Sequence, residues 1–158
     1  MKLGIMSDSH DNMPKISSAV DVFNREQVDL VVHAGDFVAP FTGKPLDKLD
    51  MPFVAVFGNN DGEVLGLAKR FEGKIHKAPH QLVFGEKKLL VCHEPIALSM
   101  LKTGTAFDAI IYGHTHQIDI QKSNTLIINP GETCGWLSGR CTVAVWDVSQ
   151  NEIRIIDI

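Results

Sequence analysis

Seven side chains suited to metal binding lie in five short polar turns of this 158-residue chain. They are Asp8, His10, Asp36, Asn59, His93, His114 and His116. Each turn directly follows an apolar run, so each is expected at the end of a strand. Because ligands of open α/β sheets bind beyond the carboxyl ends of the strands, the pattern predicts that the seven side chains meet at one site.

The residue types and their spacing indicate two divalent cations. The motifs at 8–10 and 114–116 each separate two ligands by one residue, which places both side chains on one side of an extended chain. Asp36 has two carboxylate oxygens and can bridge two ions. Imidazole and carboxylate without thiolate favour manganese, iron, zinc, nickel or cobalt over magnesium or calcium.

The expected charges favour a phosphate ester as substrate. Two divalent cations outweigh the carboxylates of Asp8 and Asp36 together with one bridging hydroxide, so the site keeps a positive charge that attracts an anion. Two ions about 3.5–4 Å apart can form hydroxide near neutral pH and stabilise the attacking and leaving oxygens. The hypothesis is therefore in-line attack on phosphorus by a metal-bridging hydroxide.

The N-terminal half of the chain predicts βαβ units that position these turns. Between the first two apolar runs, residues 16–23 have the spacing of an amphipathic helix, which Asn12 can cap. Near-continuous apolar runs suit strands buried on both faces. Such strands are predicted at 2–6, 30–32, 53–57, 89–92 and 109–112. Further helices are predicted at 44–50, 63–71 and 95–103.

The C-terminal half predicts strands in a meander. Gly85-Glu86 separates two strand-like runs and indicates a hairpin. Further strands are predicted at 118–121, 125–128, 142–148 and 153–156. Two layers of sheet with helices outside would accommodate both halves.

The order of the ligand motifs resembles that of the calcineurin-like metallophosphoesterases. The motifs are Asp8-x-His10, Gly35-Asp36, Gly58-Asn59, His93 and Gly113-His114-x-His116. The short chain is similar to the small single-domain YfcE-like phosphodiesterase branch. The resemblance implies an α/β (α+β) fold, a four-layer αββα sandwich of two mixed β-sheets flanked by helices, in one domain over 1–158.

The resemblance also implies how the ligands divide and what they do. One ion would be held by Asp8, His10 and His116, and the other by Asn59, His93 and His114. Asp36 would bridge them, and Asp36, Asn59 and His114 would be the catalytic residues. The implied enzyme is a metal-dependent phosphoric ester hydrolase, a phosphodiesterase rather than a monoesterase. Its ions would be Mn²⁺, with Ni²⁺, Co²⁺, Fe²⁺ or Zn²⁺ as alternatives, and its substrate a phosphate-ester small molecule or a nucleotide-like one.

Residue 60 departs from the family pattern. Many members have histidine directly after the motif asparagine, where it is taken to protonate the leaving group or hold the phosphate, whereas this chain has Asn60. Asparagine cannot act as a general acid, so good leaving groups are favoured. Asn60 and Asp61 are expected to support the metal ligands rather than to be ligands.

Two other functions fit parts of the sequence. A retromer subunit of this fold works mainly as a protein-interaction module with a degraded site, so a non-catalytic scaffold is one alternative. All seven ligand positions are filled here, which favours the enzyme. Cys134 and Arg140 have the spacing of a cysteine-phosphatase loop. That loop should open a helix, whereas residues 142–148 predict a strand, so the loop is expected only to join two strands.

The remaining singled-out residues are given no catalytic role. His33 is expected to be structural or to support a metal ligand, and His76 and His80 are expected to be solvated in an irregular stretch. The sequence 129–132 predicts a turn with no role for Glu132. Residues 136–137 are either a packing cluster under the loop or a dimer patch.

Composition sets the class of protein. The chain is 44% hydrophobic and 22% charged, which is typical of a globular domain. A net charge of -4 disfavours general nucleic-acid binding. No apolar run is long enough to span a membrane. Three cysteines without a signal peptide indicate a cytoplasmic protein, and a homo-oligomer stays open.

Overall fold

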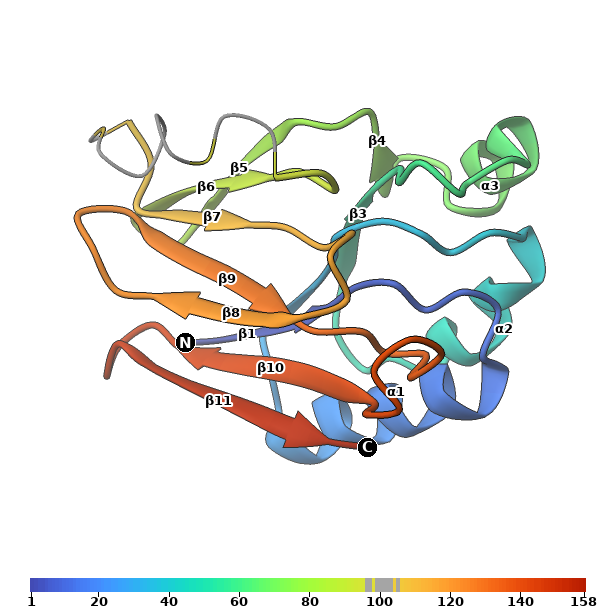
Figure 1. Ribbon diagram of the computed structural model, residues 1–158, viewed down its shortest axis with the longest axis horizontal. Coiled ribbons are helices and arrows are strands. Elements are labelled where there is room, and N and C mark those ends of the chain that lie inside the picture. The colour runs from blue at the N-terminus through green and yellow to red at the C-terminus, as the bar shows by residue number, and fades with distance from the viewer. Residues whose placement is uncertain (96–97, 99–103, 105) are drawn as a thin grey trace.

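Two mixed β-sheets packed face to face form the centre of the protein, with helices on the outside (Figure 1). The computed structural model describes residues 1–95, 98, 104 and 106–158. The helix predicted at 95–103 falls largely outside these described residues. Over the described part, the two sheets with flanking helices confirm the predicted fold class.

The first sheet has the strand order β11-β10-β1-β2-β3-β4. Strands β1 to β4 run parallel, and β10 pairs antiparallel with both β1 and β11. The strands are β1 (Lys2–Met6), β2 (Leu30–His33), β3 (Phe53–Val56), β4 (Ile75–His76), β10 (Thr142–Asp147) and β11 (Glu152–Asp157). The chain thus returns at its C-terminus to cover the edge of β1.

The second sheet has the strand order β5-β6-β7-β9-β8. Its three middle strands, β6, β7 and β9, are parallel, and the two edge strands are antiparallel to their neighbours. The strands are β5 (His80–Phe84), β6 (Lys87–Val91), β7 (Ala109–Ile111), β8 (Ile118–Gln121) and β9 (Leu126–Pro130). The predicted hairpin at Gly85-Glu86 joins β5 to β6.

The helices of the described part cover the outer face of the first sheet. They are α1 (Met13–Glu26), the 3-10 helix η1 (Pro40–Thr42), α2 (Gly43–Leu46) and α3 (Val64–Arg70). Ile16 and Phe23 of α1 and Leu67 of α3 pack in one buried cluster against the sheet. The helix predicted at 44–50 is short and begins earlier, because Pro40 starts a helical turn of its own.

Continuous apolar strands are explained by burial on both faces. Ile5 and Val32 of the first sheet meet Ile111 and Ile128 of the second in a core between the sheets. The alternate residues of the same strands face outward into two further clusters. Because no face of a central strand meets water, the apolar and polar residues do not alternate there.

His76 and His80 differ from their prediction. They belong to β4 and β5 rather than to an irregular stretch, and both are half-buried. Their rings are stacked with centroids 3.8 Å apart, because the chain crosses from one sheet to the other between them.

None of the helices over the described residues has the length and apolar character needed to cross a lipid bilayer.

Replacing Asn12 tests the start of α1. Its side-chain oxygen accepts the backbone N–H of Lys15 at 3.4 Å, and its amide donates to the carbonyl of Cys134 at 2.8 Å. Asn12→Ala should lower the free energy of unfolding by about 1 kcal/mol, measured by urea denaturation. The control Asp21→Ala, at an exposed position of the same helix, should change it by less than about 0.5 kcal/mol. Equal stabilities of the two variants would contradict this account.

Candidate metal centre

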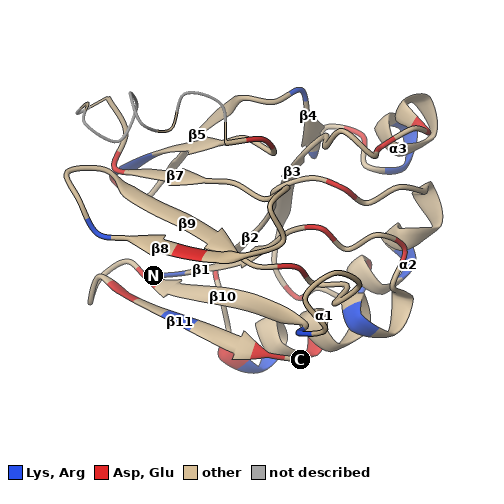
Figure 2. Ribbon diagram, in the orientation of Figure 1, with Lys and Arg blue, Asp and Glu red and all other residues tan. Residues whose placement is uncertain are grey.

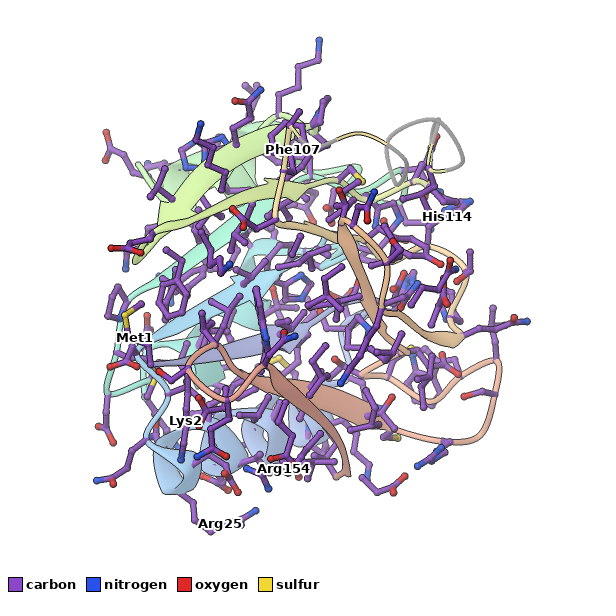
Figure 3. All side chains as sticks on the ribbon, turned by 90° about the vertical axis from the view of Figure 1, so that its left-hand side faces the viewer. Met1, Lys2, Arg25, Phe107, His114 and Arg154 are labelled. Carbon is purple, nitrogen blue, oxygen red and sulfur yellow. The ribbon has the colours of Figure 1, made fainter. Side chains whose placement is uncertain are left out.

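The loops that carry the seven candidate ligands come together at one edge of the two sheets. Parallel strands end at the same edge of a sheet, and β1, β2 and β3 are parallel in the first sheet, as are β6 and β7 in the second. The backbone N–H of His114 donates to the carboxylate of Asp8 at 3.1 Å and so links the two edges. Figure 2 shows acidic residues in these loops, and Figure 3 shows His114 near the outline of the molecule.

Short distances connect five of the seven side chains through the two buried carboxylates of Asp8 and Asp36. Nε2 of His116 lies 3.5 Å from Oδ1 of Asp8, and Nε2 of His10 lies 4.0 Å from the same oxygen. Nε2 of His10 also lies 3.4 Å from Oδ2 of Asp36. Nε2 of His93 lies 3.3 Å from that same Asp36 oxygen. Asp36 therefore stands between His10 on one side and His93 on the other.

Asn59 extends this chain of contacts to its end. Its side-chain oxygen lies 2.9 Å from Nε2 of His93 and 2.8 Å from Nδ1 of His114. Nδ1 of His93 donates to the carbonyl of Ala34 at 2.8 Å, which leaves Nε2 as the nitrogen that faces the site. The structure thus brings all seven sequence-predicted side chains into one unbroken series.

The backbone of the ligand loops is held in an uncommon conformation. Five of the seven candidate ligands have positive φ, at Asp8 (52°), His10 (37°), Asp36 (63°), His114 (66°) and His116 (59°). For residues other than glycine this left-handed region costs roughly 1–2 kcal/mol each. Such residues cluster at functional sites, where the surrounding structure holds them in place.

Two glycines allow the loops to approach one another. A side chain at Gly58 would overlap the carboxylate and backbone of Asp36, and one at Gly113 would overlap Ser7. At Gly58 the requirement for glycine is the close approach of another loop, because its φ is not in the positive range.

Asp61 and Asn60 hold Asp36 in position through hydrogen bonds. The buried carboxylate of Asp61 accepts the backbone N–H groups of Phe37 and Val38 at 2.7 and 2.8 Å, of Gly58 at 2.7 Å and of Asp36 itself at 3.2 Å. Asn60 donates to both oxygens of Asp36, through its backbone at 2.8 Å and its side chain at 2.7 Å. Hydrogen bonds to a charged group contribute about 1.5–3 kcal/mol each, enough to offset the left-handed backbone at Asp36.

Burial and local contacts shift the pKa values of the side chains in this site in opposite directions. Burial opposes the charge on Asp36, but hydrogen bonds from His93 and Asn60 outweigh it and hold the pKa of that carboxyl below its usual range. Burial raises the pKa of Asp8, whose side chain is fully enclosed. Burial alone would lower the pKa of His93, but the hydrogen bond and the charge of Asp36 together outweigh burial, so the pKa of His93 is raised. Two enclosed carboxylates side by side need positive charge near them.

The donors fit divalent cations. Nε2 of His10 is buried and makes no hydrogen bond to any residue that the structure describes, although carboxylate oxygens of Asp36 and Asp8 face it. Asp8, His10 and His116 present atoms within 4.8 Å of one another, and so do Asp8, Asp36 and His93. Imidazole nitrogens and carboxylate oxygens around shared space are the donor set expected for borderline divalent metals.

Glu132 belongs to the site, contrary to the expectation that it has no role. It follows β9, is fully buried and accepts Nδ1–H of His116 at 2.8 Å. Burial opposes its charge, but hydrogen bonds from Ser138, Cys134 and His116 lower the pKa of Glu132 to about 2. A carboxylate on the far nitrogen of a metal-ligating histidine fixes its tautomer and orientation. The sequence contains a feature that could have indicated this role, because Glu132 closely follows a strand, as the seven candidate ligands do.

The loop after Glu132 supports His10 directly and His116 through Glu132. The backbone N–H of Leu137 donates to Glu132 at 3.0 Å, and the indole N–H of Trp136 donates to the carbonyl of His10 at 3.2 Å. Trp136 is 65% and Leu137 75% exposed. The expectation of a packing cluster under this loop is therefore wrong, because hydrogen bonds rather than apolar contacts hold the loop.

Cys134 does not have the environment of a nucleophile. Burial raises the pKa of its thiol to about 12, and the neighbouring Glu132 acts in the same direction. Sγ donates to Glu132 at 3.0 Å, and the strand β10 rather than a helix follows the loop. His33 is buried, with Nε2 3.0 Å from Oγ of Ser9 and its ring stacked on Phe37.

Replacing Glu132 tests its effect on metal binding. Glu132→Gln should weaken Mn²⁺ binding roughly 10–100-fold, because the amide no longer fixes the His116 tautomer by accepting with a full charge. Titration calorimetry of the folded variant measures this change. The control Glu152→Gln removes an exposed carboxylate on β11 and should bind Mn²⁺ as the unchanged protein does. Equal affinities for both variants would show that Glu132 has no such effect.

Comparison with known proteins gives relatives that match this chain along its length. It is 37% identical over 164 residues to phosphodiesterase MJ0936 of Methanocaldococcus jannaschii, covering 99% of this chain and 98% of that protein. A solved structure of a novel archaeal phosphodiesterase superposes with a TM-score of 0.92 at 36% identity, covering 100% of both chains. YfcE, a phosphoesterase from E. coli, shares the fold with a TM-score of 0.74 at 20% identity, again over 100% of both chains.

The family match extends over nearly the whole sequence. A model of the calcineurin-like phosphoesterase superfamily domain matches residues 1–151. Together with the full-length relative, this match confirms the resemblance that the ordered ligand motifs indicated. The chain belongs to the calcineurin-like phosphoesterase superfamily.

Proposed function

We propose that this protein is a phosphodiesterase that acts with two divalent metal ions held by the seven candidate ligands. The observation that carries the proposal is the unbroken series of donors with Asp36 at its centre, between His10 and His93. The similar archaeal protein is named a phosphodiesterase, and the family implies divalent metals. When bound, two such ions would supply a hydroxide nucleophile near neutral pH and neutralise charge on the phosphate.

The chain's own residues divide into holders and supporters of the ions. We assign Asp8, His10 and His116 to one ion and Asn59, His93 and His114 to the other. Asp36 serves both. Supporting residues act from outside. Asp61 fixes the loop of Asp36, and Glu132 orients His116.

Exposure indicates the side from which a substrate arrives. Asn59 and His114 are exposed, whereas Asp8, Asp36 and His93 are buried. The phosphate should therefore approach over Asn59 and His114, and we place these two beside the reacting phosphate with Asp36 beneath them. The mixture of carboxylate, amide and imidazole donors favours Mn²⁺ as the working ion in this proposal, with Ni²⁺, Co²⁺, Fe²⁺ and Zn²⁺ as alternatives.

Hydrolysis of bis(4-nitrophenyl) phosphate with Mn²⁺ tests the proposed function. Asp36→Asn should lower kcat/KM at least roughly 100-fold, because it removes the charge shared by both ions. Asp21→Asn, which changes an exposed aspartate on α1, is the matched control and should retain activity. Chelation should abolish hydrolysis, and readdition of Mn²⁺ should restore it.

The same assay separates the alternative functions. A cysteine phosphatase would survive chelation and lose activity in Cys134→Ser. A non-catalytic scaffold would fold and bind metal without hydrolysing the ester with any of the five metals. Undiminished activity in Asp36→Asn would contradict the assigned site.

The absence of histidine at residue 60 predicts a strong dependence on the leaving group. Asn60 donates to Asp36 and cannot protonate the departing oxygen. Activated aryl phosphodiesters should therefore react roughly 10²–10⁴-fold faster than alkyl phosphodiesters, beyond the difference in uncatalysed rate. Asn60→His should raise the alkyl rates more than the aryl rates. A kcat/KM that does not vary with leaving-group pKa would overturn this expectation.

A further inference from the structure

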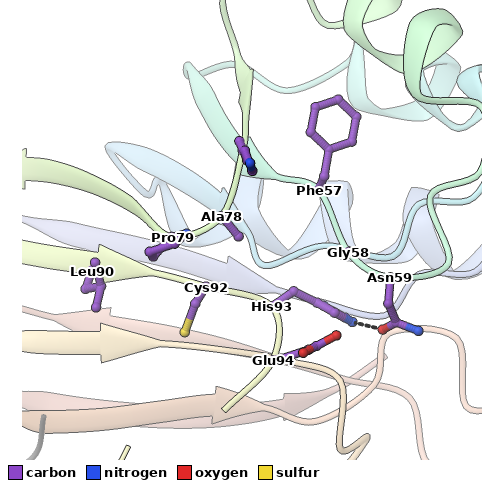
Figure 4. A pocket seen from close by; sticks show the side chains of 10 residues that line it. Phe57, Gly58, Asn59, Ala78, Pro79, Leu90, Cys92, His93 and Glu94 are labelled. Carbon is purple, nitrogen blue, oxygen red and sulfur yellow. Dashed lines mark hydrogen bonds between the residues drawn. The ribbon is translucent and has the colours of Figure 1, made fainter. Parts of the chain in front are cut away.

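A cavity of about 400 Å³ lies directly beside the candidate metal centre. Figure 4 shows two of its lining residues, Asn59 and His93, joined by their hydrogen bond of 2.9 Å. Both belong to the set proposed for the second ion. The cavity is therefore continuous with the place where a phosphate would bind.

The walls of this cavity are mostly apolar and come from both sheets. Ala78 and Pro79 belong to the segment that crosses from β4 to β5, and Leu90 and Cys92 belong to β6 and its end. Figure 4 shows the crossing segment between the end of β3 and β6. β4 has only two residues, and the segment that leaves it for β5 forms one wall of this cavity.

The charges at the cavity balance. Lys77 and Glu94 contribute one positive and one negative side chain to the lining. Neither sign is in excess among the described lining residues, so these residues do not select a second anionic group. Its volume lies in the range of pockets for small organic ligands, about 300–1,000 Å³. A methyl group would leave most of it to water, whereas an aromatic ring would displace that water and contact the apolar walls.

We infer that this cavity, the ester pocket lined by 57–59, 77–79, 90 and 92–94, binds one organic substituent of the phosphodiester, and that this substituent is an uncharged group with an aromatic ring. The inference rests on the proposed function, because the phosphate attached to that substituent is placed on the ions. It adds the substrate class. The enzyme selects diesters that carry an aryl or nucleobase-like group over those with small alkyl groups.

Binding of two phosphonates tests the ester pocket without any turnover. Titration calorimetry of the Mn²⁺-loaded protein should give a Kd for phenylphosphonate roughly tenfold lower than for methylphosphonate, the ratio expected when part of a ring leaves water. Each probe has one organic group, so the comparison does not depend on which ester group leaves. A ratio near one, or no binding of either probe, would overturn the inference.

Three variants locate the effect. Ala78→Leu fills the pocket and should reduce the ratio to about twofold or less, with the methylphosphonate Kd retained. Lys77→Met removes the rim cation without narrowing the pocket and should keep the ratio. Val83→Leu enlarges an exposed side chain of β5 away from the pocket and should also keep it. An unchanged ratio in folded Ala78→Leu would overturn the placement, and if that variant does not fold, the ratio in the unchanged protein decides.

The two proposals fail in different ways. Hydrolysis of bis(4-nitrophenyl) phosphate with equal phosphonate affinities would overturn the ester pocket and leave the phosphodiesterase in place. A preference for phenylphosphonate in a protein that hydrolyses no diester would overturn the phosphodiesterase and leave the pocket as a binding site for the organic group.

Discussion

The buried carboxylate of Asp36 is the contact on which the rest of the site depends. It faces His10 from the β1 loop and His93 from the β6 loop, so it joins the two sheets as well as the two proposed ion sites. Its position is fixed twice, by Asn60 on its oxygens and by Asp61 on its backbone N–H. A carboxylate held so firmly can remain charged in a buried place because every oxygen has a donor.

The unfavourable backbone conformations of this arrangement lie in the loops around Asp36. Left-handed backbone at five candidate ligands and close approach at Gly58 and Gly113 both oppose folding in isolation. The apolar strands behind the loops offset this, because burial on both faces stabilises the strands that end there. The core is therefore more regular than the edge that it supports.

Hydrogen bonds connect the metal ligands to groups farther from the ions. Glu132 orients His116, and the exposed Trp136 is tied to the carbonyl of His10. On the opposite side the ester pocket adjoins Asn59 and His93. The proposed reaction would thus take place between the residues that position the metal ligands and the pocket that accommodates the organic part of the substrate. Asn60, between them, supports Asp36 where other family members are expected to have a histidine.

The sequence by itself determined the family, every strand except β4 and the seven candidate ligands, because apolar runs ending in polar turns are local patterns. It also indicated the cap at Asn12 and the hairpin at Gly85-Glu86. Only the tertiary structure decided that Glu132 touches His116, that His76 stacks on His80 and that a cavity opens beside β6. These features depend on how two sheets meet. A contact between residues 16 positions or more apart, as for Glu132 and His116, is set by strand pairing and packing rather than by the spacing of neighbours in the chain.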